Sequence, residues 1–299
     1  MSLERLYAAA ATAVHAGALP AFFAHSFMVR GALAALLIGP LLGSIGPLVT
    51  VHGLAFFVQT VGHAALTGVA LGLLIGEPIG ATYVGLYGFC TLIAVLMLFL
   101  RNRMDASADT VTGVVLAQIL GLGIVMLILV TQRFNIHQVE GVLFGSLLTV
   151  TETDLLVLAC LAVGGMVLLA WLANRLLLIA FSPAIARARG LPVTVLEYLI
   201  VVLVTWMVVA SLAVIGALLV LALVVIPAAA AQRVAGSLGG VFRWSIVLAT
   251  CSSVGGFLLS AVSPIPTGAA IVLVASAVFY LALAVGAARG HRIPTPKST

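Results

Sequence analysis

His63 is the residue whose type and position point most directly to chemistry. It lies in the run Leu54–Gly76, which contains no Asp, Glu, Lys or Arg. At about 1.5 Å rise per residue, about 20 residues cover the roughly 30 Å hydrocarbon core of a bilayer, where polar side chains are costly and usually serve transport or catalysis. His63 is therefore the first candidate for a functional residue.

Two further polar side chains have helical spacing to His63. On a continuous helix, His52, Gln59 and His63 are separated by seven and four residues and fall on one face within about 40°. Neutral imidazole is the common ligand of borderline ions such as Zn²⁺, so the stripe predicts a metal site. Gln59 is a poor ligand, and His52 is expected at the membrane edge. The alternative is that His63 only bonds a carbonyl of a neighbouring helix and holds the bundle together.

The composition is that of a polytopic membrane protein. Of the 299 residues, 64% are hydrophobic and 7% are charged, and the mean hydropathy is +1.33. Soluble domains have about a quarter charged residues. No soluble part is large enough to bind a nucleotide, so we expect energy to come from another chain or from an ion gradient. The sequence lacks the common zinc-protease, serine-hydrolase and phosphate-loop motifs, and its three cysteines have no paired spacing. We predict no catalytic role.

Nine apolar segments predict an all-α membrane helix bundle of about eight or nine transmembrane helices. The count is eight if the sixth and seventh segments, which meet at Ala213–Leu219 without a polar break, form one span. We expect an N-terminal surface or re-entrant segment (1–27), a transmembrane domain (28–288) and a cytoplasmic tail (289–299). The net charge of +5 comes from short groups of basic residues between the segments, which mark the cytoplasmic loops rather than a nucleic-acid surface.

One cytoplasmic connection, Arg175–Pro192, is more than a turn. Ser182 is placed to cap a helix, Pro183 suits its first turn, and Gly190 with Pro192 would end it. The pattern predicts a short helix of about two turns between two spans. Its position suits it to docking against another chain.

Three ordered motifs of the chain have counterparts in a known family. The first reads Ala55-Phe-Phe-Val-Gln-Thr-Val-Gly-His-Ala-Ala-Leu-Thr-Gly-Val-Ala70, the second Phe181-Ser-Pro-Ala-Ile-Ala-Arg-Ala-Arg-Gly-Leu-Pro192, and the third Val214-Ile-Gly-Ala-Leu-Leu-Val-Leu-Ala-Leu-Val-Val-Ile-Pro-Ala-Ala-Ala-Ala231. They resemble motifs in the permease subunits of ABC-type importers for zinc, manganese and iron. The resemblance spans roughly residues 27–287.

The resemblance implies a multi-pass cell-membrane subunit that works with other chains. These are a second permease subunit, in a homodimer or heterodimer, two cytoplasmic ATPase subunits, and an extracytoplasmic metal-binding protein. The cargo would be Zn²⁺, Mn²⁺ or Fe²⁺, with no permanently bound cofactor and with ATP on the partner subunit. Arg175–Pro192 would be the coupling region, and the residues implied in ATPase coupling are Ser182, Ala186, Arg187, Arg189 and Gly190.

The resemblance also assigns a role to the polar stripe. The family carries an Asp and a His on its second span that are taken to line the metal path, and these correspond here to Gln59 and His63. Gln59 removes a negative charge that would offset a dication in low dielectric, which bears on affinity, ion preference and metal binding itself. Two other interpretations stay open. The chain could import a bulky chelate, such as a siderophore or cobalamin, or be a membrane protein that transports nothing.

Overall fold

The computed structural model describes residues 25–78, 82–104, 108–132 and 150–288, together with the single residues Tyr7, Thr12, Val14, Pro20 and Phe23; the side chains of residues 108, 213, 217 and 218 are not included. Most of the predicted N-terminal segment and all of the tail 289–299 lie outside the described residues.

The described residues form ten helices, as the apolar runs of the sequence predict. Eight of them are long and apolar enough to cross a membrane, and the apolar part of α10, Leu219–Val234, is shorter. The prediction of an all-α bundle with eight or nine membrane helices is confirmed. The helices are α2 Ser26–Val51, α3 Ala55–Ile75, α4 Tyr83–Arg103, α5 Ala108–Thr131, α7 Glu152–Phe181, α8 Pro183–Ala188, α9 Val193–Ile215, α10 Ala217–Val234, α11 Leu238–Val262 and α12 Thr267–Ala288.

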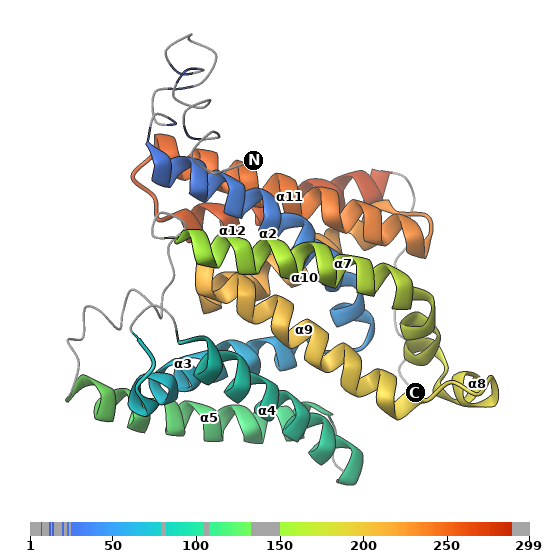
Figure 1. Ribbon diagram of the computed structural model, residues 1–299. Coiled ribbons are helices and arrows are strands. Elements are labelled where there is room, and N and C mark those ends of the chain that lie inside the picture. The colour runs from blue at the N-terminus through green and yellow to red at the C-terminus, as the bar shows by residue number, and fades with distance from the viewer. Residues whose placement is uncertain are drawn as a thin grey trace.

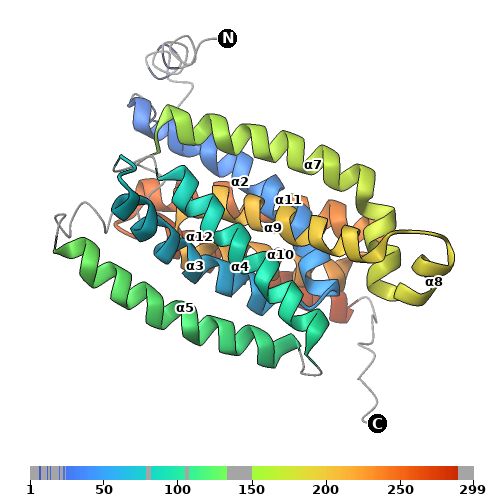
Figure 2. The same cartoon turned by 60° about the horizontal axis from the view of Figure 1, so that its bottom comes forward.

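The helices pack in two groups that meet at α9 (Figure 1). The larger group is formed by α2, α7, α10, α11 and α12, with the most extensive contact between α2 and α11. The smaller group is formed by α3, α4 and α5, in which α3 packs closely on both of its neighbours. Helix α5 lies at the outer edge of the molecule (Figure 2). His63 belongs to the smaller group, and contacts of α3 and α4 with α9 and α10 join this group to the rest.

The junction between the sixth and seventh apolar segments is a break between two helices. Helix α9 ends at Ile215 and α10 begins at Ala217, with Gly216 between them at φ 82°. Positive φ is readily adopted by glycine and costly for residues with a Cβ atom. Gly216 therefore interrupts the helix without a polar residue, which is why hydropathy alone left the count open.

The connection 175–192 differs in part from the prediction. Helix α7 continues to Phe181, so residues 175–181 are its last two turns rather than part of a separate connection, because the sequence from Leu176 to Phe181 is apolar. The predicted short helix is confirmed as α8. Its N-cap Ser182 accepts a hydrogen bond from the Ile185 N–H at 3.5 Å, and Gly190 has a φ of 74° just after it.

Most of the described basic residues lie at one end of the bundle, while Arg30, near the start of α2, lies toward the other end. Basic residues gather at the end that carries α8, where α4 finishes with Arg101 and Arg103 (Figure 1). The described acidic residues at the other end are Glu77, Glu152 and Asp154. Since cytoplasmic loops are enriched in Lys and Arg, we assign the α8 end to the cytoplasm.

Candidate metal site

Helix α3 positions His63 near mid-depth of the bundle. His63 is the ninth residue of the helix, about 12 Å along the axis from Ala55 and about 18 Å from Ile75. Gln59 lies one turn earlier on the same face. Both side chains are half-buried, and they share their stripe with the exposed Phe56 and the half-buried Leu66. The prediction that Gln59 and His63 lie on one helical face is confirmed.

The rest of α3 packs closely against α4 and α5, and this packing includes Thr67, which lies one turn beyond His63 on the same stripe. Val61 is fully buried, and its carbonyl accepts a hydrogen bond from Cys90 Sγ of α4 at 3.8 Å. Thr67 is fully buried, and its hydroxyl donates to the Ile119 carbonyl of α5 at 3.5 Å. The Gln59 and His63 side chains form no hydrogen bond with any other residue that the structure describes. The alternative role of His63, bonding a carbonyl of a neighbouring helix, therefore has no support within the described chain.

The predicted stripe is wrong for His52. His52 is the C-cap of α2, and a turn containing Gly53 at φ 66° separates it from α3, which begins at Ala55. The helical count from His52 to Gln59 therefore does not apply, because the two residues are on different helices. The His52 ring is engaged locally, since its Nδ1–H donates to the Leu48 carbonyl at 3.0 Å.

The surroundings of His52 favour its neutral form. Burial lowers the pKa of His52 below its usual value, and the positive charge of Arg101 lowers it further, while the hydrogen bond to Leu48 acts in the opposite direction. The hydrogen bond from Nδ1–H to Leu48 closes the last turn of α2 and fixes the ring at the end of a different helix from Gln59 and His63.

The α3–α4 hairpin is held by a residue that the sequence analysis did not single out. The Glu77 carboxylate accepts hydrogen bonds from the N–H groups of Val84 and Gly85, each at 2.9 Å, and so caps the first turn of α4. Below this cap the two helices meet through glycines, because a Cβ atom on Gly85 would lie 2.5 Å from the Gly68 carbonyl oxygen and 2.6 Å from the Gly72 Cα. The only sequence signal for Glu77 was an acidic residue in a turn before an apolar helix.

Two hydrogen bonds between side chains attach α4 to α7 of the larger helix group and to α9. The Tyr83 hydroxyl donates to Asp154 Oδ1 at 2.8 Å, at the start of α7, and Trp206 Nε1–H of α9 donates to the Thr91 hydroxyl at 2.9 Å. Asp154 also belongs to the capping box of α7 with Thr151. These contacts hold the hairpin that carries His63 against the rest of the bundle.

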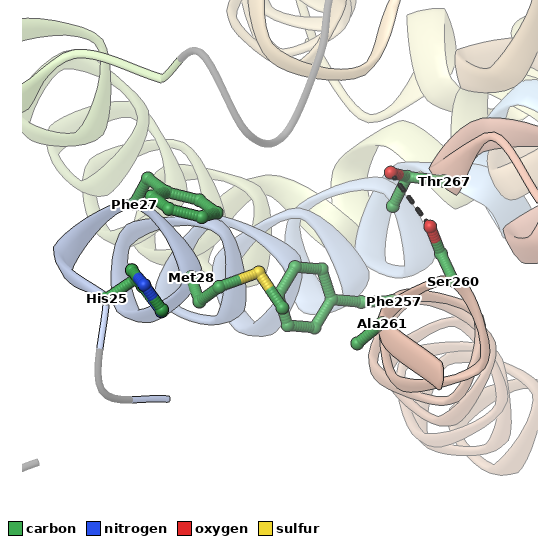
Figure 3. A pocket seen from close by; sticks show the side chains of 7 residues that line it. All are labelled: His25, Phe27, Met28, Phe257, Ser260, Ala261 and Thr267. Atoms are coloured by element: carbon green, nitrogen blue, oxygen red, sulfur yellow. Dashed lines mark hydrogen bonds between the residues drawn. The ribbon is translucent and has the colours of Figure 1, made fainter. Parts of the chain in front are cut away.

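A cavity of about 340 Å³ lies away from this stripe, at the end opposite α8. It is bounded by the start of α2, the end of α11 and the start of α12 (Figure 3). The Ser260 hydroxyl on its wall donates to the Ile265 carbonyl at 2.9 Å and lies 3.2 Å from the Thr267 hydroxyl. The lining also includes the imidazole of His25, and the other lining residues are apolar. One imidazole beside a bonded pair of hydroxyls offers few donors, so this cavity is a poor ion site.

The described residues contain no group of three or more His, Cys, Asp or Glu side chains placed to hold a metal ion. An imidazole and an amide from one chain are two donors, whereas ions such as Zn²⁺ take four ligands in closed sites and three protein ligands in open ones. A metal site at His63 therefore needs donors beyond these two side chains, from residues that the structure does not describe, from another chain or from water.

Comparison with known proteins places this arrangement in a family. Residues 24–286 match the ABC 3 transport family. The chain belongs to this family. It is 29% identical over 260 residues to the manganese transport system membrane protein MntC of Halalkalibacterium halodurans, with 86% of this chain and 87% of the relative covered. It is 28% identical over 257 residues to the high-affinity zinc uptake system membrane protein ZnuB of Haemophilus influenzae, with 86% and 95% covered.

A solved structure shows the same fold. In PsaBC from Streptococcus pneumoniae in complex with Fab, a chain that is 25% identical superposes with a TM-score of 0.75, and 91% of this chain and 92% of that chain are covered. The ABC 3 family chain is thus a multi-pass membrane permease subunit without its own ATPase site, and it works with ATPase and binding-protein partners. The prediction of a non-catalytic membrane subunit is confirmed by this membership.

Proposed function

We propose that this permease belongs to an ATP-driven importer that moves a divalent transition-metal ion, Zn²⁺, Mn²⁺ or Fe²⁺, into the cytoplasm. The observation that carries the proposal is the open stripe of α3, where Gln59 and His63 are half-buried and form no hydrogen bond with the described residues. The manganese and zinc transport systems of the relatives support the class of ion.

A second permease subunit, identical or related, explains why this stripe is open. An imidazole and an amide facing hydrocarbon without partners would cost several kcal/mol. If two subunits face each other across their α3 helices, Gln59 and His63 of both line one water-accessible path, and two imidazoles and two amides can contact the same ion. The ion is cargo in this scheme, delivered by an extracytoplasmic metal-binding protein.

The helix α8 is proposed as the contact with two cytoplasmic ATPase subunits. Ala186 is fully buried and anchors α8 against the bundle, and the Leu191 N–H donates to its carbonyl at 3.1 Å. Arg187 and Arg189 are exposed on the same short helix and its cap. A helix fixed on one side and basic on the other can transmit movement of an ATPase to α7 and α9, with Ser182 and Gly190 defining its ends.

The role of His63 is tested by metal uptake in cells that express the complete transporter and lack their own zinc and manganese importers. We expect His63→Ala to lower uptake of Zn²⁺ or Mn²⁺ by at least about tenfold, the usual effect of disturbing a metal site. Leu66→Ala is the matched control, because Leu66 is also half-buried on the open stripe and has no donor atom. Equal uptake by the two variants, with normal assembly, would contradict the proposal, as would ATPase stimulation by a metal chelate only.

The coupling role is tested separately by charge reversal. We expect Arg187→Glu with Arg189→Glu to weaken ATPase binding and transport, because both residues are exposed on the cytoplasmic element. Arg243→Glu is the control, since Arg243 is also an exposed arginine but lies on α11 rather than on α8. Normal ATPase copurification and metal uptake by the double variant would exclude α8 as the coupling element.

A further inference from the structure

The interior of the bundle offers the ion no carboxylate in its described part. The described acidic residues all lie at or near helix ends: Glu77 follows α3, Asp109 is in the first turn of α5, Glu152 and Asp154 are in the first turn of α7, and Glu197 is the fifth residue of α9. The sequence of α3 itself, Ala55–Ile75, contains no acidic residue. Negative charge is therefore absent from the stripe that carries Gln59 and His63.

Sulfur ligands are also absent from this stripe. Helix α3 contains neither Cys nor Met. The nearest cysteine whose bonding is defined, Cys90 of α4, is fully buried and bonds the Val61 carbonyl on another face of α3. Cys160 and Cys251 are exposed on α7 and α11, which belong to the larger helix group. In a homodimer, the donors on the stripe are thus one imidazole nitrogen and one amide oxygen from each subunit.

This donor set distinguishes Zn²⁺ from Mn²⁺, whereas the relatives include both zinc and manganese transport systems. Mn²⁺ is a hard ion suited to carboxylate, carbonyl and water ligands, whereas imidazole suits Zn²⁺, and nitrogen sites bind Mn²⁺ more weakly than Zn²⁺. A carboxylate would also offset the charge of a dication in low dielectric. This stabilisation matters more for Mn²⁺, which is held mainly by electrostatics, than for Zn²⁺. With only neutral donors, binding depends on the strength of the metal–nitrogen bond.

We infer that the Gln59–His63 stripe makes this permease a zinc-selective path that discriminates against Mn²⁺, with Gln59 as the selectivity residue. The inference rests on the proposed function, since it requires that the ion passes the stripe. It goes further in naming the ion and the residue that sets the preference. The lack of a carboxylate also keeps binding weak, which allows the ion to leave toward the cytoplasm.

The test compares two variants of nearly equal size that differ in charge, Gln59→Asp and Gln59→Asn. Uptake of radioactive Zn²⁺ and Mn²⁺ is measured for the complete transporter in cells without other importers of these ions. The same metal-binding protein serves all variants, so its own preference cancels when their Mn²⁺-to-Zn²⁺ uptake ratios are compared. We expect Gln59→Asp to raise this ratio about tenfold over Gln59→Asn, consistent with the tuning of ion affinity by ligand charge. Wild type should show a ratio close to that of Gln59→Asn, because both side chains are neutral amides.

The outcomes separate the two proposals. Equal ratios in the Asp and Asn variants would overturn the selectivity inference. If His63→Ala still lowers uptake by at least about tenfold in that case, the proposed metal path stands. Full uptake of both ions by His63→Ala removes the metal path and the inference together. If Gln59→Asp fails to assemble, Gln59→Glu replaces it, with wild-type Gln59 as its neutral partner of equal size.

Discussion

Substitution of Gly85 by alanine tests whether glycine contacts hold the helix that carries His63. A Cβ atom at this position would lie 2.5 Å from the Gly68 carbonyl oxygen and 2.6 Å from both the N and the Cα of Gly72. Ordinary carbon contacts need about 3.5–4.0 Å, so α3 and α4 would have to separate by about 1 Å. All three contacted atoms are backbone, so no side chain can rotate away to relieve the overlap.

The expected cost is that of overpacking a tight interface, about 1–3 kcal/mol. For a chain of this size it corresponds to a fall in melting temperature on the order of 5 °C. Gly88→Ala is the matched control, because Gly88 lies on the same helix with nothing within 4 Å of the added Cβ atom. That variant should melt at the same temperature or slightly higher, since alanine favours helix over glycine by up to about 1 kcal/mol.

Cys90 provides the assay. It is fully buried between α4 and α3, whereas Cys160 and Cys251 are exposed. Replacing the other two cysteines, with Cys160→Ser and Cys251→Ser, leaves Cys90 as the remaining thiol. Its reaction with a fluorescent thiol dye on heating then reports the separation of α4 from α3. Identical reaction profiles for the Gly85 and Gly88 variants would refute the glycine-contact argument.

Two further predictions concern the ends of the same helices. Glu77→Ala removes the acceptor for the N–H groups of Val84 and Gly85 and should cost about 1–2 kcal/mol, measured as earlier exposure of Cys90 on heating; an unchanged profile would show that water replaces this cap. The pKa of His52 is lowered in the folded chain, so below about pH 6.5 the unfolded state binds the proton more readily. The stability of the folded chain therefore decreases as the pH is lowered. His52→Gln should reduce the loss of melting temperature between pH 7 and pH 5, and an equally steep loss would exclude His52 as its source.

The membrane helices were predictable because their signal is local. Long apolar runs without charge determine where a span can lie, and Ser182 with Gly190 marked the ends of α8 correctly. The joint stripe of His52, Gln59 and His63 failed because a helical count assumes that the helix is continuous. Gly53, with its positive φ, ends that continuity two residues before α3 begins. A single glycine in an apolar sequence is a weak signal, since most glycines of this chain lie within helices.

The cap at Glu77 was missed for a different reason. Its function depends on short distances to N–H groups seven and eight residues later. The sequence pattern does not reveal how the turn between them brings these groups together. The same limit applied to Gly85, whose contacts with Gly68 and Gly72 depend on how the two helices cross. Periodicity could locate a polar face, but the packing that leaves this face open comes from tertiary contacts.

The openness of the stripe follows from how α3 uses its other faces. Glycine contacts take the side toward α4, and Thr67 bonds α5. Among the polar side chains of α3, Gln59 and His63 are the two that form no hydrogen bond with a described residue. The position of His63 then depends on the α3–α4 hairpin as a unit. Gly85→Ala and Glu77→Ala, which change no group able to touch the ion, should therefore lower metal uptake while leaving the Mn²⁺-to-Zn²⁺ ratio unchanged. A change in that ratio would mean that selectivity arises from the geometry of the hairpin rather than from the charge at Gln59.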